Sequence, residues 1–267
     1  MKRVLGALGA VVGLAFGLFV SFNASKVHDW QLLDRGIEYR VFRISLVPLT
    51  GDGLLHVVRL DPADVTFELG LRSEDGALHS AADWASRKGW SVVFNAGMYE
   101  TDLRTNVGYL RHRGHVNNPR WKTSFEAVLA LDGFDGGVAL LDRDAPTFAS
   151  ESAGYDTLVQ NLRTVKAPGT NVWEPNDRSW TEATVAQDGQ GRILFLFTGT
   201  RFNQSEFNDR ILALPLDVAR AMHVEGGPEG SLSIHTPVMT VDLNGETAIG
   251  RTNQWEIPNV IGVRTRP

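Results

Sequence analysis

The stretch Val224-Glu225-Gly226-Gly227-Pro228-Glu229-Gly230-Ser231-Leu232 places two carboxylates around a pair of glycines and a proline. It follows a segment rich in apolar residues that begins near Leu212. Glycine permits positive φ and a close approach to a ligand, whereas proline fixes φ and removes a donor. We therefore expect a sharp turn after a buried segment, with Glu225 at the floor of a pocket and Glu229 nearby. Such carboxylates suit proton transfer or sugar binding, and a plain turn with two solvated glutamates is the alternative.

The composition is that of an ordinary globular protein. Of 267 residues, 43% are hydrophobic and 21% are charged. The net charge is −5 and the basic residues are not clustered, so we expect no nucleic-acid partner. The absence of cysteine excludes disulfides and thiol chemistry. The sequence lacks a nucleophile elbow, a P-loop and a dinucleotide fingerprint, which disfavours serine hydrolases, NTPases and dehydrogenases.

The N-terminus has the features of an export signal. The basic pair Lys2-Arg3 precedes an apolar segment over residues 4–22, which is long for a signal peptide and just long enough to span a bilayer. A cleavage site after residue 24 would place the bulky Phe22 where a small residue is preferred. We expect residues 1–24 to be a signal peptide or a membrane anchor, and the only membrane contact. Residues 25–267 are then periplasmic or held at the outer face of the cytoplasmic membrane.

The rest of the chain is predicted to contain mainly strands. Alternating or short apolar runs between turn residues predict strands over residues 37–44, 54–60, 65–71, 90–94, 125–131, 138–141, 158–161, 184–186, 192–197, 238–243 and 260–263. Asn244-Gly245 predicts a turn between the last two strands. Hairpins outnumber βαβ units, which favours an α+β fold. We expect a single domain with a largely antiparallel, hairpin-rich sheet and a few short helices.

Helices and loops are predicted from caps and composition. Ser80 as N-cap and Gly89 as a stop predict a short helix between them. Two further short helices are predicted over residues 206–214 and 216–222. Polar residues predict loops over 102–120 and 166–180.

Two polar motifs are candidates for substrate binding. A predicted strand runs into Asn95-Ala96-Gly97, and strand ends that feed loops commonly carry binding groups. The Asn95 amide suits a sugar hydroxyl or a phosphate oxygen, with an ordinary asparagine turn as the alternative. The loop that contains Asn106, His115 and Asn117 is rich in neutral donors. His115 suits proton transfer or phosphate binding, and a solvated loop is the alternative.

Three arginines, Arg163, Arg178 and Arg201, lie in or beside predicted loops. A guanidinium matches phosphate oxygens in a bidentate way, whereas most arginines are simply solvated. No metal site is predicted, because His112 and His115 lack a helical setting and a third ligand.

In their order along the chain, these motifs resemble the phosphodiester glycosidase domain family, and in particular exported bacterial relatives of the mannose-6-phosphate uncovering enzyme. The resemblance runs from about residue 90 to the C-terminus. It is carried by Asn95-Ala96-Gly97-Met98-Tyr99, Thr105-Asn106-Val107-Gly108, His115-Val116-Asn117-Asn118, Gln160-Asn161-Leu162-Arg163, Trp180 before the Asp188-Gly189 turn, and Glu225-Gly226-Gly227 in place of the family's Asp-Gly-Gly signature.

The chain departs from the family pattern at two positions. Glutamate replaces the aspartate of Asp-Gly-Gly, as in a bacterial branch that carries Glu-Gly-Gly-Pro-Glu. The family arginine that precedes the Asp188 turn corresponds to Glu182, with Arg178 four residues earlier as the candidate replacement.

The resemblance implies an exported hydrolase of a glycosyl (sugar-1-) phosphodiester in the cell envelope. The alternative is a non-catalytic module that binds an envelope glycan or a sugar phosphate in the same pocket. No cofactor is demanded, although Ca²⁺ or Mg²⁺ is compatible with carboxylates and phosphate. The expected catalytic residues are Glu225, Glu229 and His115, and the expected substrate-binding residues are Asn95, Gly97, Asn106, Asn117, Arg163, Arg178, Arg201, Gly226 and Gly227.

Overall fold

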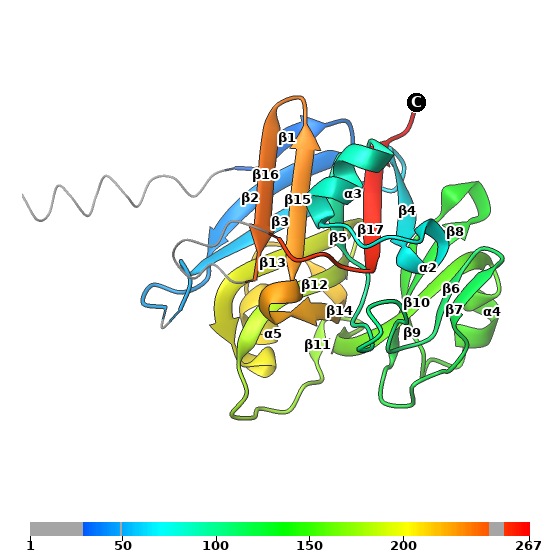
Figure 1. The fold of residues 1–267 in the computed structure, drawn as a ribbon. Coiled ribbons are helices and arrows are strands. Elements are labelled where there is room, and N and C mark those ends of the chain that lie inside the picture. Colours follow the sequence, from blue (N-terminus) through cyan, green and yellow to red (C-terminus); the bar gives the residue numbers. More distant parts are fainter. Residues whose placement is uncertain (1–28, 49, 246–253) are drawn as a thin grey trace, which may run out of the picture.

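The computed structural model describes residues 29–48, 50–245 and 254–267 (Figure 1). The predicted signal or anchor segment, residues 1–24, lies outside these described residues. Within them, no helix combines the length and the hydrophobicity needed to cross a membrane.

The described strands form two sheets, in which every pairing is antiparallel. The larger sheet has the order β1-β2-β3-β13-β12-β14-β10-β6-β7, with β8 and β11 paired to β10 and β9 paired to β8. Its strands are β1 (Gln31–Asp34), β2 (Ile37–Arg43), β3 (Leu54–Leu60), β6 (Leu110–His112), β7 (His115–Asn118), β8 (Ala127–Gly133), β9 (Ala139–Asp142), β10 (Tyr155–Lys166), β11 (Thr170–Asn171), β12 (Trp180–Asp188), β13 (Ile193–Phe202) and β14 (Val218–Gly226).

The smaller sheet has the order β16-β15-β5-β17-β4. Its strands are β4 (Val65–Leu71), β5 (Val92–Asn95), β15 (Ser231–Thr236), β16 (Met239–Asn244) and β17 (Asn259–Thr265). The helices are short: α2 (Arg72–Asp75), α3 (Ala81–Lys88), α4 (Phe148–Ser152) and α5 (Gln204–Leu212), with 3₁₀ turns η1 (Phe134–Gly136) and η2 (Gly227–Glu229).

The main core lies between the two sheets, which pack face to face. Phe94 on β5 stacks on Phe195 on β13, with ring centroids 4.7 Å apart. Both rings belong to one apolar cluster to which strands of both sheets contribute. The helix α3 covers the outer face of the smaller sheet through the buried Trp84 (Figure 1). The helix α5 covers the outer face of the larger sheet through Phe207.

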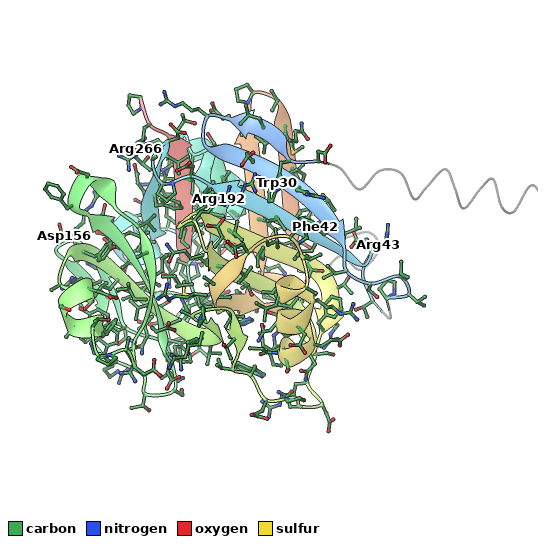
Figure 2. The ribbon with its side chains drawn as sticks, turned by 180° about the vertical axis from the view of Figure 1, so that it is seen from behind. Trp30, Phe42, Arg43, Asp156, Arg192 and Arg266 are labelled. Carbon is green, nitrogen blue, oxygen red and sulfur yellow. The ribbon has the colours of Figure 1, made fainter. Side chains whose placement is uncertain are left out.

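The beginning of the described chain is attached to the larger sheet by aromatic contacts. Trp30 packs edge to face against Phe42 of β2, with centroids 6.3 Å apart, and the Arg59 guanidinium lies 3.7 Å from a Trp30 ring centroid (Figure 2). At the other end of the chain, Arg266 donates to the Val65 carbonyl at 3.0 Å. Both described ends are thus held on the sandwich.

The predicted antiparallel, hairpin-rich architecture is confirmed, and the fold is more strongly β than the α+β expectation. The helix predicted between Ser80 and Gly89 is α3. The Ser80 hydroxyl accepts from the Asp83 N–H, and Gly89 ends the helix with φ of 66°. The helix α5 corresponds to the one predicted over residues 206–214.

The prediction of a helix over residues 216–222 is wrong, because strand β14 begins within this segment, at Val218. β14 lies between β12 and β10 and is hydrogen-bonded on both edges. Its side chains contact the core on one face and α5 on the other, so the sequence shows no clean alternation. A short apolar run of this kind does not distinguish a buried strand from a buried helix.

Two further local predictions are wrong. The segment 102–120, expected to be a loop, contains the hairpin of β6 and β7. The strand predicted over residues 238–243 corresponds to β16. It forms no hairpin with the last strand at Asn244-Gly245, because β16 pairs with β15. The predicted loop over 166–180 contains only the two-residue strand β11.

The turn after β14 carries the chain from one sheet to the other. β14 belongs to the larger sheet and β15 to the smaller, and η2 is the connection between them. The stretch over residues 224–232 therefore lies at one end of the sandwich, where the two sheets are joined.

Candidate active site

Asn95, at the end of β5, holds the turn between β14 and β15 through two hydrogen bonds. The Asn95 amide nitrogen donates to the Glu229 carbonyl at 3.0 Å, and its oxygen accepts from the Ser231 N–H at 2.7 Å. Gly227 has φ of 69°, which a residue with a side chain adopts only with strain. Asn95 is itself buried, at 1% exposure, and its amide oxygen and nitrogen both bond to this turn.

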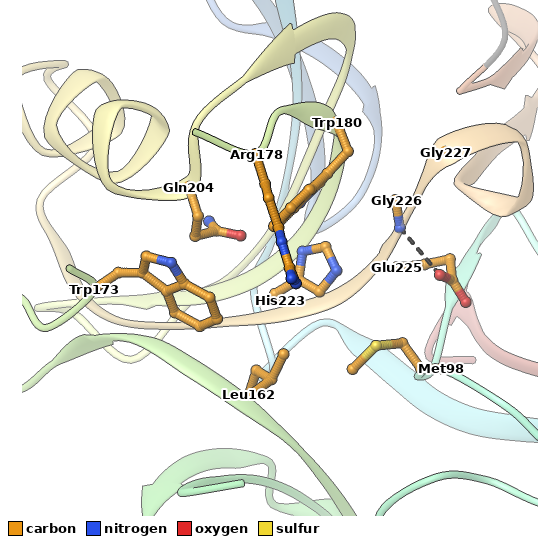
Figure 3. A pocket seen from close by; sticks show the side chains of 10 residues that line it. All are labelled: Met98, Leu162, Trp173, Arg178, Trp180, Gln204, His223, Glu225, Gly226 and Gly227. Atoms are coloured by element: carbon orange, nitrogen blue, oxygen red, sulfur yellow. Dashed lines mark hydrogen bonds between the residues drawn. The ribbon is translucent and has the colours of Figure 1, made fainter. Parts of the chain in front are cut away.

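Beside this turn the surface is hollowed into a pocket of about 520 Å³ (Figure 3). Its walls come from β14, from the segment that leads into β12, from the start of α5, from β10 and from the loop after β5. The lining residues are Met98, Leu162, Trp173, Arg178, Trp180, Gln204, His223, Glu225, Gly226 and Gly227. The stretch over residues 224–232 thus contributes to the pocket wall.

The pKa of Glu225 lies near neutral pH. Its carboxylate accepts from the Gly226 N–H at 3.1 Å. Burial, reinforced by the charge of Glu229, raises the pKa of Glu225 to about 7, and the neighbouring His223 and the Gly226 N–H oppose the shift. A carboxyl group with this pKa exists in both protonation states at neutral pH, as a general acid or base requires.

Glu229 lies close enough to Glu225 to influence its pKa, and both glutamates influence the pKa of Tyr99, although neither Glu229 nor Tyr99 lines the pocket. Burial and the charges of both glutamates hold the pKa of the Tyr99 hydroxyl well above its usual value. Tyr99 therefore stays a neutral donor at physiological pH.

A buried pair, Glu182 and His223, forms the back of the pocket. The His223 Nδ1 atom lies 2.8 Å from the Glu182 Oε2 atom. Glu182 is fully buried and His223 is 6% exposed. Gln204 supports the pair, because its amide nitrogen, when turned towards Glu182, lies 3.2 Å from both carboxylate oxygens.

The charges of the pair depend on each other. Burial raises the pKa of Glu182 even though His223 pulls it down. Burial alone would lower the pKa of His223, but attraction to Glu182 and Glu225 outweighs it and leaves that pKa raised. Both shifts favour retention of a proton by the Glu182–His223 pair.

Arg178 supplies a cation at the mouth of the pocket. Its side chain extends into the pocket between Trp173 and Trp180 (Figure 3). It is exposed and forms no ion pair with any residue that the structure describes. Arg201 does not line the pocket, but donates to the Ser179 carbonyl at 2.8 Å and so steadies the segment that carries Arg178.

The motif around residues 105–118 does not reach the pocket. The Asn106 N–H donates to the Asn117 side chain at 2.7 Å, and Asn117 donates to the Ser73 hydroxyl at 2.9 Å. His115 contacts the same hydroxyl at 2.8 Å. Asn106, Asn117 and His115 therefore hold this loop against α2, and none of them lines the pocket.

Arg163 also lies away from the pocket. It is 7% exposed and forms ion pairs with Glu126, with Asp142 at 3.3 Å and with Asp144 at 2.6 Å. Its charge is thus neutralised by carboxylates, and Arg178 is the better candidate for binding phosphate.

The glycines of the motifs are required by packing. A Cβ atom on Gly97 would lie 2.6 Å from the Asn161 side-chain oxygen and 2.9 Å from that of Asn106. A Cβ atom on Gly226 would lie 2.6 Å from the Thr181 carbonyl. Gly97 therefore serves a buried amide cluster, whereas Gly226 and Gly227 form the pocket wall itself.

Sequence reasoning missed several pocket residues, above all His223 and Trp173. His223 precedes Glu225 by two residues, a spacing that places both side chains on the same side of a regular strand. That signal was lost because the preceding residues were predicted as a helix. In β14 a register shift lies between the two residues, with His223 opposite Thr184 and Glu225 opposite Ala183. Glu182 was noticed only as the residue at the position of the family arginine. Among the described residues, no three His, Asp or Glu side chains gather as a candidate metal site.

Comparison with known proteins identifies the class that this fold and site define. The sequence model of the family described as phosphodiester glycosidase matches residues 88–264. The chain therefore belongs to the phosphodiester glycosidase family, and the resemblance read from its motifs is confirmed. No curated protein sequence matches the chain.

Solved structures share the fold at low sequence identity. One is the catalytic domain of the zebrafish N-acetylglucosamine-1-phosphodiester alpha-N-acetylglucosaminidase, auto-inhibited by its pro-peptide, with a TM-score of 0.61 and 13% identity over 92% of this chain and 91% of that chain. Another is a hypothetical protein from Synechocystis, with a TM-score of 0.64 and 10% identity over 91% of this chain and 65% of that one.

Proposed function

We propose that the protein is an exported hydrolase of a glycosyl phosphodiester, in which a sugar is linked through C1 to a phosphate that carries a second group. Membership of the phosphodiester glycosidase family supports this reaction class. The apolar segment over residues 4–22 supports export, with a carbohydrate phosphodiester of the cell envelope as the substrate class.

The observation that carries the proposal is that a candidate base and a cation line the same pocket. Glu225, with a pKa raised to about 7, and Arg178, without an acidic partner among the described residues, line the same pocket. Hydrolysis of a phosphodiester needs a cation to hold the anionic group and a base to activate water. Arg178 provides the first and Glu225 the second.

The aromatic walls complete the binding site. Trp173 and Trp180 flank Arg178 and offer apolar surface to a sugar ring or to the second group of the diester. Glu229 acts on Glu225 through its charge, which helps to raise the pKa of Glu225.

The test is a hydrolysis assay with the purified full-length protein in detergent. N-acetylglucosamine-1-phosphodiesters and UDP-sugars are incubated with and without EDTA, and free sugar and phosphomonoester are measured. We expect sugar release that survives EDTA. Glu151→Gln, an exposed glutamate on α4, is the matched control for Glu225→Gln.

The products decide between the two functions weighed from the sequence. Sugar release that the Glu225→Gln substitution abolishes supports the hydrolase. A folded protein that releases nothing from any of these substrates, yet binds sugar phosphates in calorimetry, would instead be the non-catalytic binding module.

A further inference from the structure

The Glu182–His223 pair is oriented with one imidazole nitrogen towards protein and the other towards the pocket. Nδ1 is engaged by the Glu182 carboxylate at 2.8 Å. When Glu182 is ionised, its carboxylate only accepts hydrogen bonds, and Nδ1 is the donor to it. His223 lines the pocket, and no described residue bonds its Nε2 atom. Nε2 is therefore the atom that His223 presents to a ligand.

The burial of Glu182 favours a protonated imidazole beside it. Glu182 has no exposed surface, and a buried carboxylate without a partner is strongly disfavoured. Among the described residues its ion-pair partner is His223, and Gln204 is placed to donate to both carboxylate oxygens. An imidazolium can release its proton near neutral pH, whereas an arginine or lysine in its place would keep its proton.

We propose that Glu182 holds His223 as the proton donor of this pocket, with Nε2 giving its proton to the bridging oxygen of the substrate. This inference rests on the proposed function and assigns the acid that complements Glu225 as base. His223 is then a catalytic residue, and Glu182 is a positioning residue that acts through it.

The step balances for either bond of the C–O–P linkage. Water attacks C1 or phosphorus, and the new bond forms to the water oxygen while Glu225 takes a proton from that water. The bond to the bridging oxygen breaks with its electron pair on oxygen, and the Nε2 proton of His223 neutralises it. Glu225 then releases its proton to solvent and His223 takes one up from solvent, which restores both groups.

Other charged and polar groups face His223 from the elements packed against it. They are Glu182, Thr184 and Trp180 from β12, Glu225 from β14 itself, Gln204 from α5, and Arg178 from the segment before β12. Arg178 disfavours the imidazolium, whereas the two glutamates favour it. Removing the Glu182 charge should therefore shift the equilibrium towards neutral imidazole.

The experiment measures the titration of His223 by NMR and the pH profile of kcat in the same full-length preparations. His223→Gln assigns the imidazole signal, and Glu182→Gln keeps the shape of the buried side chain while removing its charge. Asp242→Asn is the matched control, because Asp242 pairs with His235 at 2.9 Å away from the pocket residues.

We expect wild-type His223 to titrate above 6.5, the ordinary value, and to titrate at lower pH in Glu182→Gln. The alkaline limb of the kcat profile should move to lower pH in the same variant. It should be absent in His223→Gln, in which kcat falls by about 10²–10⁴-fold, the usual contribution of a general acid. Asp242→Asn should leave the profile in place.

Two results would overturn the inference. One is a His223 that is neutral at pH 6.5 in the wild type, a measurement that needs neither turnover nor a folded Glu182→Gln variant. The other is an alkaline limb that stays in place in a folded Glu182→Gln variant, which indicates a purely structural role. Absence of turnover in the wild type with His223 protonated would refute the proposed function. This outcome is distinct from the two results that would overturn the role of His223.

Discussion

Burial makes Glu225 a weaker acid than a solvated glutamate, and this has a consequence for stability. The pKa of about 7 in the folded protein lies above the ordinary value of 4.5. The folded state therefore binds the Glu225 proton more tightly than the unfolded chain does. The associated stabilisation is fully present below pH 4.5 and is lost as the pH rises through about 7.

Glu225→Gln should therefore stabilise the protein at alkaline pH, because glutamine never acquires the buried charge. We expect its free energy of unfolding at pH 8 to exceed that of the wild type by on the order of 1–3 kcal/mol, with little difference at pH 4.5. Urea unfolding at the two pH values measures this. Glu151→Gln serves as the exposed control, and an equal effect of Glu225→Gln at both pH values would contradict the assignment.

Arg178→Ala should weaken substrate binding without affecting the fold, because Arg178 is exposed and unpaired among the described residues. A hydrogen bond to a charged group contributes about 1.5–3 kcal/mol, which corresponds to roughly a 10–100-fold rise in KM. Steady-state kinetics with a glycosyl phosphodiester measures the rise. Arg87→Ala, an exposed arginine on α3, should leave KM unchanged. Arg178 would lose its role if both variants behaved alike.

At the scale of elements, the connection between β14 and β15 sets the geometry of the pocket. Asn95 makes two hydrogen bonds to this connection from the neighbouring strand. Asn95→Ala should lower both stability and kcat, since it leaves the buried Ser231 N–H without a partner, which costs about 1–3 kcal/mol. Thermal unfolding and the hydrolysis assay check the two effects together. A variant with lower stability but unchanged kcat would contradict the claim that the geometry of this turn affects catalysis.

Local signals were sufficient to predict some elements but not others. Ser80 and Gly89 define α3 because helix caps are short-range features. β14 was missed because its apolar residues face two cores, and only the pairing with β10 and β12 settles its conformation. Arg163 looked available for phosphate because its three acidic partners lie 19 to 37 residues away in sequence.

The candidate site was predictable to the extent that it lies in one continuous stretch. Glu225, Gly226 and Gly227 were found from their own turn, and Arg178 from its loop. Glu182 and His223 were not, because their relation depends on the register of β12 against β14. Glu182 and His223 are 41 residues apart in sequence and become neighbours only when β12 pairs with β14.

At the scale of the whole molecule, two sheets and two covering helices enclose one main core, so the pocket depends on contacts far from it. Phe94 stacks on Phe195 across the sheets and adjoins Asn95, which holds the turn. Truncation of a buried phenylalanine usually costs about 3–5 kcal/mol. Phe94→Ala should lower the unfolding midpoint in urea and lower kcat together. Phe134→Ala, which removes a ring that is 91% exposed, is the control and should change neither.

The same scale explains why family membership and substrate are separate questions. The fold is shared with an N-acetylglucosaminidase at 13% identity, a level at which side chains in a pocket diverge while sheets persist. In this chain the pocket combines Glu225, Arg178 and the Glu182–His223 pair, and these groups are the basis of the proposed chemistry.

The decisive measurement is turnover and binding of one glycosyl phosphodiester by the wild type and by Glu225→Gln. We predict that Glu225→Gln loses about 10²–10⁴-fold in kcat, as expected for removal of a general base, while calorimetry shows affinity equal to or higher than that of the wild type. Unchanged turnover in Glu225→Gln, or binding that disappears together with its charge in a protein that never releases sugar, would contradict the assignment of Glu225 as the base of a hydrolase.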